Sequence, residues 1–191
     1  MYNDKKPFRR DSRPPRRNNT PPARKRLTYR DGTPLGSEAW ISPWVELKYF
    51  SYNPAVFPRM IGAISPEAGP GELVHVYDKN GELFGAGFWN EPSRTPLRMV
   101  YHGKDAFSET GLDKAIAAAV RLRREVLRLD ETTNAYRVIH GDSDGIGGLI
   151  VDRYADVLSL EVSTLGAWQR LERWLPMLHK LCGTSRHVIQ V

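Results

Sequence analysis

Residues 72–89 read ELVHVYDKNGELFGAGFW and carry the clearest structural signal in this sequence. Apolar and polar residues alternate on both sides of Lys79-Asn80-Gly81, as expected for two strands that each bury one face. An Asn-Gly pair between two such runs predicts a β-hairpin. Shorter runs at residues 44–50 and 96–102 predict further strands, and residues 56–64 predict a helical turn or another strand. We therefore expect a small β-barrel over residues 44–102.

The hydrophobic pattern changes from period 2 to period 3.6 after residue 110. Leu112, Ile116 and Val120 fall on one face of an amphipathic helix of about 20 residues. A second helix is expected at residues 166–181, stopped by Gly183. Around these helices the sequence predicts strands at residues 136–140, 149–153, 157–162 and 187–191. The expected fold class is α+β, a barrel followed by a strand-strand-helix-strand-strand type of domain.

The first 30 residues differ in composition from the rest of the chain. They hold eleven Lys or Arg against Asp4 and Asp11, a net charge of +9, so the chain total of +6 leaves −3 for the remaining 161 residues. Their richness in Pro, Asn and Arg predicts a disordered basic tail, with a Gly- and Pro-rich linker up to residue 43. Such a tail attracts phosphates, which suggests RNA or the ribosome as partner. A merely solubilising extension is the alternative.

Cysteine usage and hydropathy point to a cytoplasmic protein. Cys182 is the only cysteine, so the chain can form neither an internal disulfide nor a CxxC metal site. No apolar run is long enough for a membrane span, and no apolar segment follows the first charges as in a signal peptide. We expect no membrane partner.

The loop at residues 141–148 matches several motifs in part. Residues 141–145 fit the G-x-S-x-G nucleophile elbow of hydrolases, but that elbow needs a following helix and a β run follows here. Asp142 and Asp144 resemble a calcium loop, yet Ile146 stands where a third oxygen ligand belongs. The glycines do not fit a dinucleotide-binding pattern. We therefore expect no hydrolase, metal or nucleotide site, and we interpret the two acids as loop caps.

A longer stretch around this loop carries a family likeness. Residues 136–154 read YRVIHGDSDGIGGLIVDRY and resemble the "RL…GDGLPGLIVDRY" segment of the class I methyltransferases that make 5-methylcytosine in large-subunit ribosomal RNA. Residues 74–90 resemble the hairpin of that family's N-terminal PUA domain. The likeness covers about residues 44–191. The sequence departs from the family pattern at residues 54–64, where the family's "HPWVFSGAI" segment is not matched. RNA contacts that the family makes with this segment are therefore not carried over with the same support.

The resemblance implies a domain organisation and a function. Residues 1–43 would be tail and linker, residues 44–104 a PUA-like RNA-binding domain, and residues 105–191 a helix plus a central joining domain, cut off before a Rossmann-like catalytic domain. The expected function is the RNA-binding N-terminal portion of an S-adenosylmethionine-dependent ribosomal RNA cytosine-5 methyltransferase. Its partners would be ribosomal RNA and, if the gene is split, a separate catalytic chain. A free-standing RNA-binding protein is the alternative.

Activity of this chain alone is not expected, although the complete family protein is an enzyme. Cytosine-5 methylation needs a cysteine thiolate and a glycine-rich turn that holds the methyl donor. Cys182 lies at the end of an apolar helix and is interpreted as a buried structural residue. We therefore predict no catalytic residue, no metal and no cofactor site here, with S-adenosylmethionine bound only by the complete family protein.

Five residues of the expected barrel are candidate RNA contacts, because aromatic and Arg side chains on a β surface can stack on bases and hold phosphates. They are Arg59, Trp89, Asn90, Arg94 and Arg98. Trp89 could instead be a core aromatic, and the arginines could be merely solvated. Asp152 and Arg153 are expected to form an internal ion pair or turn bond within the joining domain.

Overall fold

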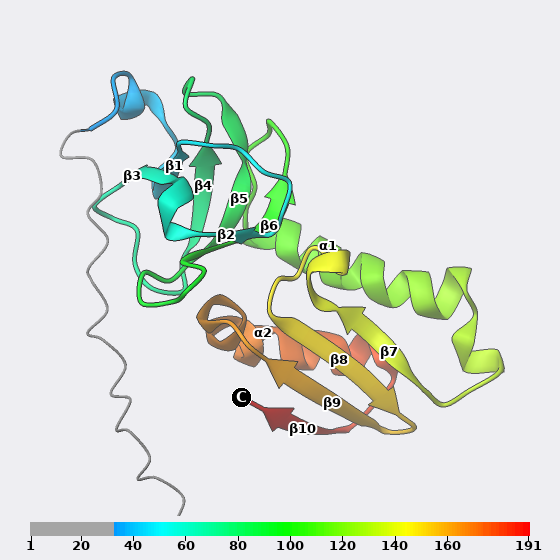
Figure 1. Ribbon diagram of the computed structural model, residues 1–191. Helices are drawn as coiled ribbons and strands as arrows, with labels where there is room; N and C mark the ends of the chain where they lie inside the picture. Colours follow the sequence, from blue (N-terminus) through cyan, green and yellow to red (C-terminus); the bar gives the residue numbers. More distant parts are fainter. Residues whose placement is uncertain (1–32) are drawn as a thin grey trace, which may run out of the picture.

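The computed structural model of the protein describes residues 33–191, and Figure 1 shows them as two packed units. The predicted basic tail lies outside the described residues. The first unit is a six-stranded curled sheet with the order β2-β6-β5-β4-β1-β3. Its strands are β1 (Trp44–Leu47), β2 (Ala55–Val56), β3 (Ile61–Ile64), β4 (Leu73–Tyr77), β5 (Leu83–Trp89) and β6 (Leu97–His102).

The predicted hairpin is confirmed as the centre of this sheet. β4 and β5 pair antiparallel, and β6 continues the meander. The Asp78 carboxylate accepts hydrogen bonds from the N–H groups of Asn80 and Glu82, both at 2.9 Å, and Gly81 adopts a positive φ of 78°. Only glycine takes such a φ without strain, which explains the Asn-Gly turn.

The sheet curls because its two edge strands follow each other in the chain. β2 and β3 lie at opposite ends of the strand order, but only the 3-10 turn η2 (Pro58–Met60) and Phe57 separate them. The edges are therefore held near each other, and the apolar faces of Val45, Val76 and Met99 are enclosed. The sequence predicted either a helical turn or a strand at residues 56–64, and the structure contains both.

The expected linker packs against the sheet near its end. After η1 (Ser37–Ala39), the Trp40 ring stacks on Tyr77 with centroids 4.3 Å apart, and the Ile41 N–H donates to the Tyr77 hydroxyl at 2.9 Å. The first unit therefore begins at least four residues before Trp44. The Gly- and Pro-rich composition of this segment does not reveal that the Trp40 ring packs on the sheet.

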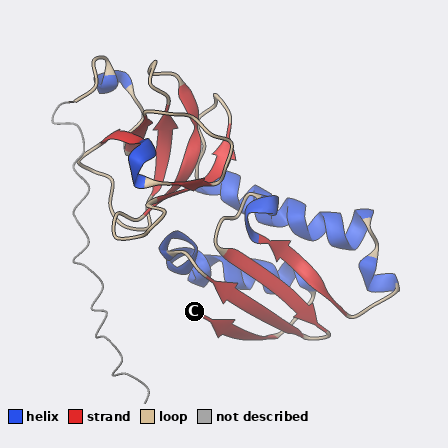
Figure 2. Cartoon of the chain, in the orientation of Figure 1, coloured by secondary structure: helices blue, strands red, loops and turns tan. Residues whose placement is uncertain are grey.

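The second unit is a four-stranded sheet with the order β10-β9-β8-β7, covered on one face by two helices (Figure 2). Its elements are α1 (Glu109–Arg121), extended by η3 (Leu122–Val126) and η4 (Leu129–Glu131), then β7 (Ala135–His140), η5 (Gly141–Asp144), β8 (Leu149–Tyr154), β9 (Val157–Val162), α2 (Leu165–Cys182) and β10 (Arg186–Gln190).

The elements follow one another in the order of the segments that the sequence predicted, but this order differs from the expected strand-strand-helix-strand-strand label. Three antiparallel strands precede α2, and β10 then joins β9 in parallel at the sheet edge. The reason is the tight turn at Ala155, whose φ of 53° lets β9 return beside β8 without a helix between them. No helix among the described residues is long and apolar enough to cross a membrane.

One hydrophobic core joins the two units. Phe88 of β5 and Val100 of β6 pack with Leu112 of α1, Leu149 of β8 and Trp174 of α2. Burying a side chain as large as phenylalanine stabilises the fold by about 1.5–3 kcal/mol. The relative orientation of the units is therefore set by packing rather than by a flexible connection.

Candidate nucleic-acid interface

Four of the five sequence-predicted RNA contacts lie on the hairpin of β5 and β6, but two of them are not available to RNA. Trp89 ends β5 and is only 2% exposed, packed in the core of the first unit. A ring buried there has no free face for a nucleobase, so we correct its assignment to a core aromatic. The signal was ambiguous because an aromatic at the end of a strand fits either role.

Arg98 is also committed elsewhere. Its guanidinium binds the Asp142 carboxylate with both Nε and Nη2, the first bond measuring 2.8 Å. The two side chains are 30% and 27% exposed. This charged pair connects β6 to η5 of the second unit. The Arg98 side chain therefore links the two units through an ion pair. Asp142 is the ion-pair partner of Arg98 rather than a simple loop cap.

The remaining three candidates stay predictions. Arg59 is exposed on η2, and Arg94 is exposed in the loop between β5 and β6. Within residues 33–191 neither forms an ion pair, so both guanidinium groups are free to meet a phosphate. The Asn90 N–H donates to the Pro96 carbonyl at 2.7 Å and helps to close that loop.

The second acid of the loop has the expected structural role. Asp144 receives two bonds from Arg123, at 2.7 and 2.9 Å, and accepts the His140 N–H at 2.6 Å. Asp152 and Arg153 are paired too, but not with each other: Asp152 binds Arg137 at 2.8 Å, and Arg153 binds Asp130 at 2.6 Å. Consecutive strand residues point to opposite faces, which prevents the expected direct pair.

The glycines of the loop at residues 141–148 allow close packing within the protein. A Cβ on Gly147 would lie 2.8 Å from Arg98 Cγ, and one on Gly148 would lie 2.2 Å from Thr164 Oγ1. The glycines thus allow the chain to pack closely against its own side chains. Past Gly145 the chain enters β8, so no helix follows the loop directly. The N-cap of α2, Thr164, does lie against the loop, and its Oγ1 donates to the Gly147 carbonyl at 3.0 Å and accepts the Ala167 N–H at 3.3 Å.

Cys182 behaves as the sequence predicts. Its side chain is buried at the end of α2, and this burial raises the pKa of the thiol to about 11. A thiol that stays protonated at neutral pH is a poor nucleophile.

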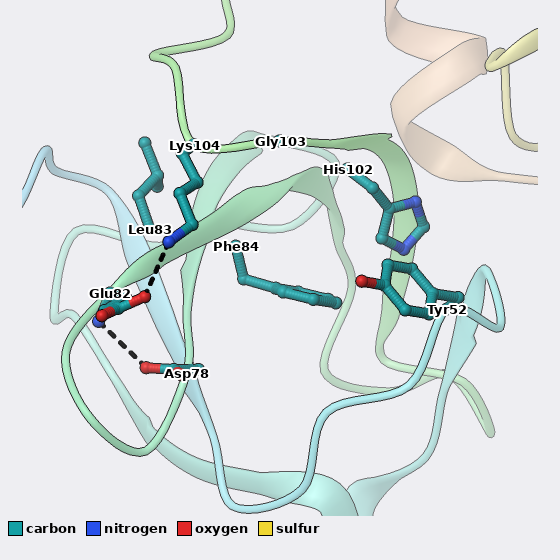
Figure 3. Close-up of a pocket in the computed structure, with 8 residues that line it drawn as sticks. All are labelled: Tyr52, Asp78, Glu82, Leu83, Phe84, His102, Gly103 and Lys104. Atoms are coloured by element: carbon teal, nitrogen blue, oxygen red, sulfur yellow. Dashed lines mark hydrogen bonds and ion pairs between the residues drawn. The ribbon is translucent and has the colours of Figure 1, made fainter.

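A cluster of aromatic rings around a surface pocket was missed from the sequence. We call it the aromatic groove and define it by four rings: Phe50, Tyr52, Phe84 and His102. Phe84 lies in the middle, with ring centroids 5.6 Å from Phe50, 5.7 Å from Tyr52 and 5.4 Å from His102. Figure 3 shows Tyr52, Phe84 and His102 around a pocket of about 190 Å³.

The groove is formed by a loop placed over a sheet. Phe84 and His102 come from the paired strands β5 and β6. Phe50 and Tyr52 come from residues 48–54, which leave β1 after Leu47. Ser51 and Asn53 shape this loop, because the Asn53 N–H donates to Ser51 Oγ at 3.1 Å and the Ala55 N–H donates to Asn53 Oδ1 at 2.9 Å.

The side chains around the groove include both lysines and acids. Lys48 and Lys79 line an adjacent hollow of about 440 Å³ with Tyr49 and Phe50, and neither lysine forms an ion pair in the described part of the chain. The acids are occupied: Asp78 holds the hairpin turn, and Glu82 binds Lys104 at 3.0 Å. Burial lowers the pKa of His102, so this ring is neutral at physiological pH.

A clue to this groove was present in the sequence. Residues 48–52 read KYFSY, three aromatics within four positions beside a lysine. The first of them were assigned to a half-buried strand at residues 44–50. A strand would send Tyr49 and Phe50 to opposite faces and bury one of them, whereas both are more than 60% exposed.

Comparison with known proteins finds a known type of domain in the first unit. Residues 42–101 match the family model of a PUA-like domain. Ribosomal RNA large subunit methyltransferase of Deinococcus radiodurans is 32% identical over 142 residues, which cover 72% of this chain and 35% of the relative. Ribosomal RNA large subunit methyltransferase I of Shewanella amazonensis is 30% identical, over 60% of this chain and 29% of the relative. The chain spans about a third of the length of these relatives.

Solved structures show the same fold. A structure from Streptococcus mutans described as a SAM-dependent methyltransferase superposes with a TM-score of 0.52 at 16% identity, covering 63% of this chain and 33% of that one. A methyltransferase structure complexed with SAH gives a TM-score of 0.53 at 16% identity, over 64% and 33% of the two chains. Together with the sequence matches, these findings show that the chain carries a PUA-like domain and is homologous to ribosomal RNA large subunit methyltransferases.

Proposed function

We propose that this chain is the RNA-binding N-terminal portion of a large-subunit ribosomal RNA methyltransferase. The observation that carries the proposal is the match of 142 residues to the Deinococcus radiodurans protein. This match is longer than the PUA-like segment at residues 42–101, so it extends into the second unit. The two units share one core, and they are expected to bind RNA as one body.

In this proposal the chain holds RNA while a methyltransferase domain, in the same or another chain, supplies the chemistry. S-adenosylmethionine would be the methyl donor of that domain. The resemblance of residues 136–154 further suggests 5-methylcytosine as the product, and a ribosomal RNA substrate implies a cytoplasmic location. The described residues contribute RNA affinity and orientation in this proposal, and the glycines of their loop pack closely on Arg98 and Thr164.

The first test is RNA preference. We expect the full chain to bind transcripts of large-subunit ribosomal RNA more tightly than small-subunit transcripts or duplex DNA of equal length, measured by filter binding at one fixed salt concentration. Fixed salt is essential because phosphate contacts make affinity strongly salt-dependent. Equal affinity for all three polymers would contradict a specific role in large-subunit recognition.

The second test is catalysis. We expect no label in ribosomal RNA after incubation of this chain with labelled S-adenosylmethionine, since the only thiol has a pKa of about 11 and is buried. The matched control is a complete ribosomal RNA methyltransferase from the same family, incubated under the same conditions. Incorporation of label by this chain alone would show that it contains the methyl-transfer site.

A further inference from the structure

We propose that the aromatic groove is a binding site for unpaired RNA bases, in which a base stacks on Phe50 or Tyr52 while neighbouring phosphates lie against Lys48 and Lys79. The inference rests on the proposed RNA-binding function and adds the place and the class of ligand: single-stranded RNA rather than a duplex.

Two rings of the groove are exposed to solvent rather than packed in the core. Phe50 is 62% exposed and Tyr52 is 71% exposed. Two ring pairs outside the groove are stacked in parallel, Trp40 on Tyr77 at 6° and Tyr101 on Phe107 at 10°. In the groove the interplanar angles run from 43° to 87°. Tilted and edge contacts of this kind leave ring faces open to a further planar group.

The loop that carries Phe50 and Tyr52 is ordered before any ligand binds. The side chains of Ser51 and Asn53 hold the backbone of the loop, and Phe84 supports the rings of Phe50 and Tyr52 from the sheet. Because the loop is already ordered by these contacts, stacking a base costs little further conformational entropy. Clusters of exposed apolar side chains usually mark interaction sites in soluble proteins.

Two lysines beside the groove can pair with the phosphates of a polyanion. Lys48 and Lys79 have no ion-pair partner among residues 33–191, whereas the nearby Asp78 and Glu82 are bound to the hairpin turn and to Lys104. Aromatic faces beside free cations are the combination that binds single-stranded nucleic acid, since bases stack and phosphates pair. A duplex keeps its base faces covered and could use only the lysines. A peptide ligand would not need the two free cations.

The decisive comparison uses a short single-stranded oligoadenylate and the double variant Phe50→Leu/Tyr52→Leu. Leucine keeps the apolar character but removes the stacking faces, so we expect the Kd to rise at least about fivefold. Tyr154→Leu is the matched control: Tyr154 is 55% exposed but lies on β8 in the other unit, so its Kd should not change. If the double variant fails to fold, Tyr52→Leu alone provides the same comparison.

The charge arm uses Lys48→Gln/Lys79→Gln. Removing two phosphate contacts should lower the slope of log K against log salt by about 1.4. Lys114→Gln is the matched control, because Lys114 is an exposed lysine on α1 with no ion pair in the described residues. Its slope should equal that of the unmodified chain.

The outcomes separate this inference from the proposed function. If the unmodified chain binds large-subunit ribosomal RNA, but oligoadenylate affinity is the same in the groove variants, the groove assignment is wrong and the proposed function stands. If a hairpin duplex binds as tightly as oligoadenylate and loses as much affinity in the leucine variant, base stacking is excluded. If no RNA binds at all, both proposals fail.

Discussion

At the scale of single residues, Arg98 illustrates how one side chain can carry two interpretations. On a strand of an RNA-binding domain it suggests a phosphate contact, but its two bonds to Asp142 occupy the guanidinium. The glycine at position 147 belongs to the same arrangement, because only a residue without Cβ leaves space for the Arg98 stem. The pair thus links the two units across a separation of 44 residues.

We expect Arg98→Ala to lower the free energy of unfolding by about 1–2 kcal/mol, since it leaves the partly buried Asp142 carboxylate without its partner. Urea denaturation of the full chain measures this change. Arg94→Ala is the matched control: Arg94 is exposed and has no ion pair within residues 33–191, so the loss there should stay below about 0.5 kcal/mol. Equal losses in the two variants would remove the structural role assigned to Arg98.

Two histidines make stability depend on pH. Burial lowers the pKa of His75 and of His102 below the usual histidine value of about 6.5. The unfolded chain therefore binds more protons than the folded protein just below pH 6.5, and stability falls as the pH decreases through this window. Above it both states are neutral and stability is fully retained.

The measurement is the urea midpoint between about pH 5 and 8. We expect it to decrease toward acid in the unmodified chain and to decrease less in His102→Gln, which cannot take up the proton. A midpoint that rises toward acid would show that the imidazolium forms are stabilised in the fold, contrary to their burial.

At the scale of elements, the N-terminus of α2 lies where the two units meet. Gly166 is its second residue and sits against the ring of Phe88, where an added Cβ would be 2.3 Å from Cγ. The next turn of the helix adds Arg170, whose guanidinium lies 4.7 Å from the same ring and donates to the Gly71 carbonyl at 2.9 Å. Close backbone approach therefore sets how α2 docks on the first unit.

This contact predicts the sign of a substitution. In an ordinary helix Gly→Ala stabilises by about 0.5–1 kcal/mol. We expect Gly166→Ala to destabilise by about 1–3 kcal/mol instead, because the ring and the helix must separate. Thermal or urea unfolding measures the change. Ala118→Gly on the exposed side of α1 is the control, because it measures the difference in helix propensity between alanine and glycine without a packing contact. We expect it to lower the free energy of unfolding by about 0.5–1 kcal/mol. A stabilised Gly166→Ala variant would show that the interface is looser than described.

At the scale of the whole molecule, charge is distributed unevenly. Residues 1–30 carry +9 and the remaining 161 residues carry −3. Net charge therefore cannot attract RNA to the folded part, where binding must depend on local groups such as Lys48 and Lys79. The basic segment would supply the sequence-independent attraction.

We expect deletion of residues 1–30 to flatten the salt dependence of RNA affinity, with the slope falling by about 0.7 for each single-strand phosphate contact that is lost. A chain of full length with all eleven Lys and Arg of this segment replaced by Gln separates charge from length and should behave like the deletion. An unchanged slope in both variants would place all phosphate contacts in the folded part.

Several parts of the fold were determined by the sequence itself. The hairpin of β4 and β5 follows from the alternation around Asn80-Gly81, and the two helices follow from their 3.6-residue period. These features depend on residues that are neighbours in the chain, so local conformational preference and one-sided burial are sufficient to specify them. The order of the helices and strands along the chain can be predicted from the sequence for the same reason.

Only the tertiary structure decided which side chains are available for function. It buried Trp89, paired Arg98 with Asp142, and placed Phe50 and Tyr52 of one loop beside Phe84 and His102 of two strands. Exposure and partner choice depend on contacts between residues far apart in sequence, and a strand pattern does not reveal which residue will face which. The aromatic groove therefore became visible only once β1, β5 and β6 were placed in one sheet.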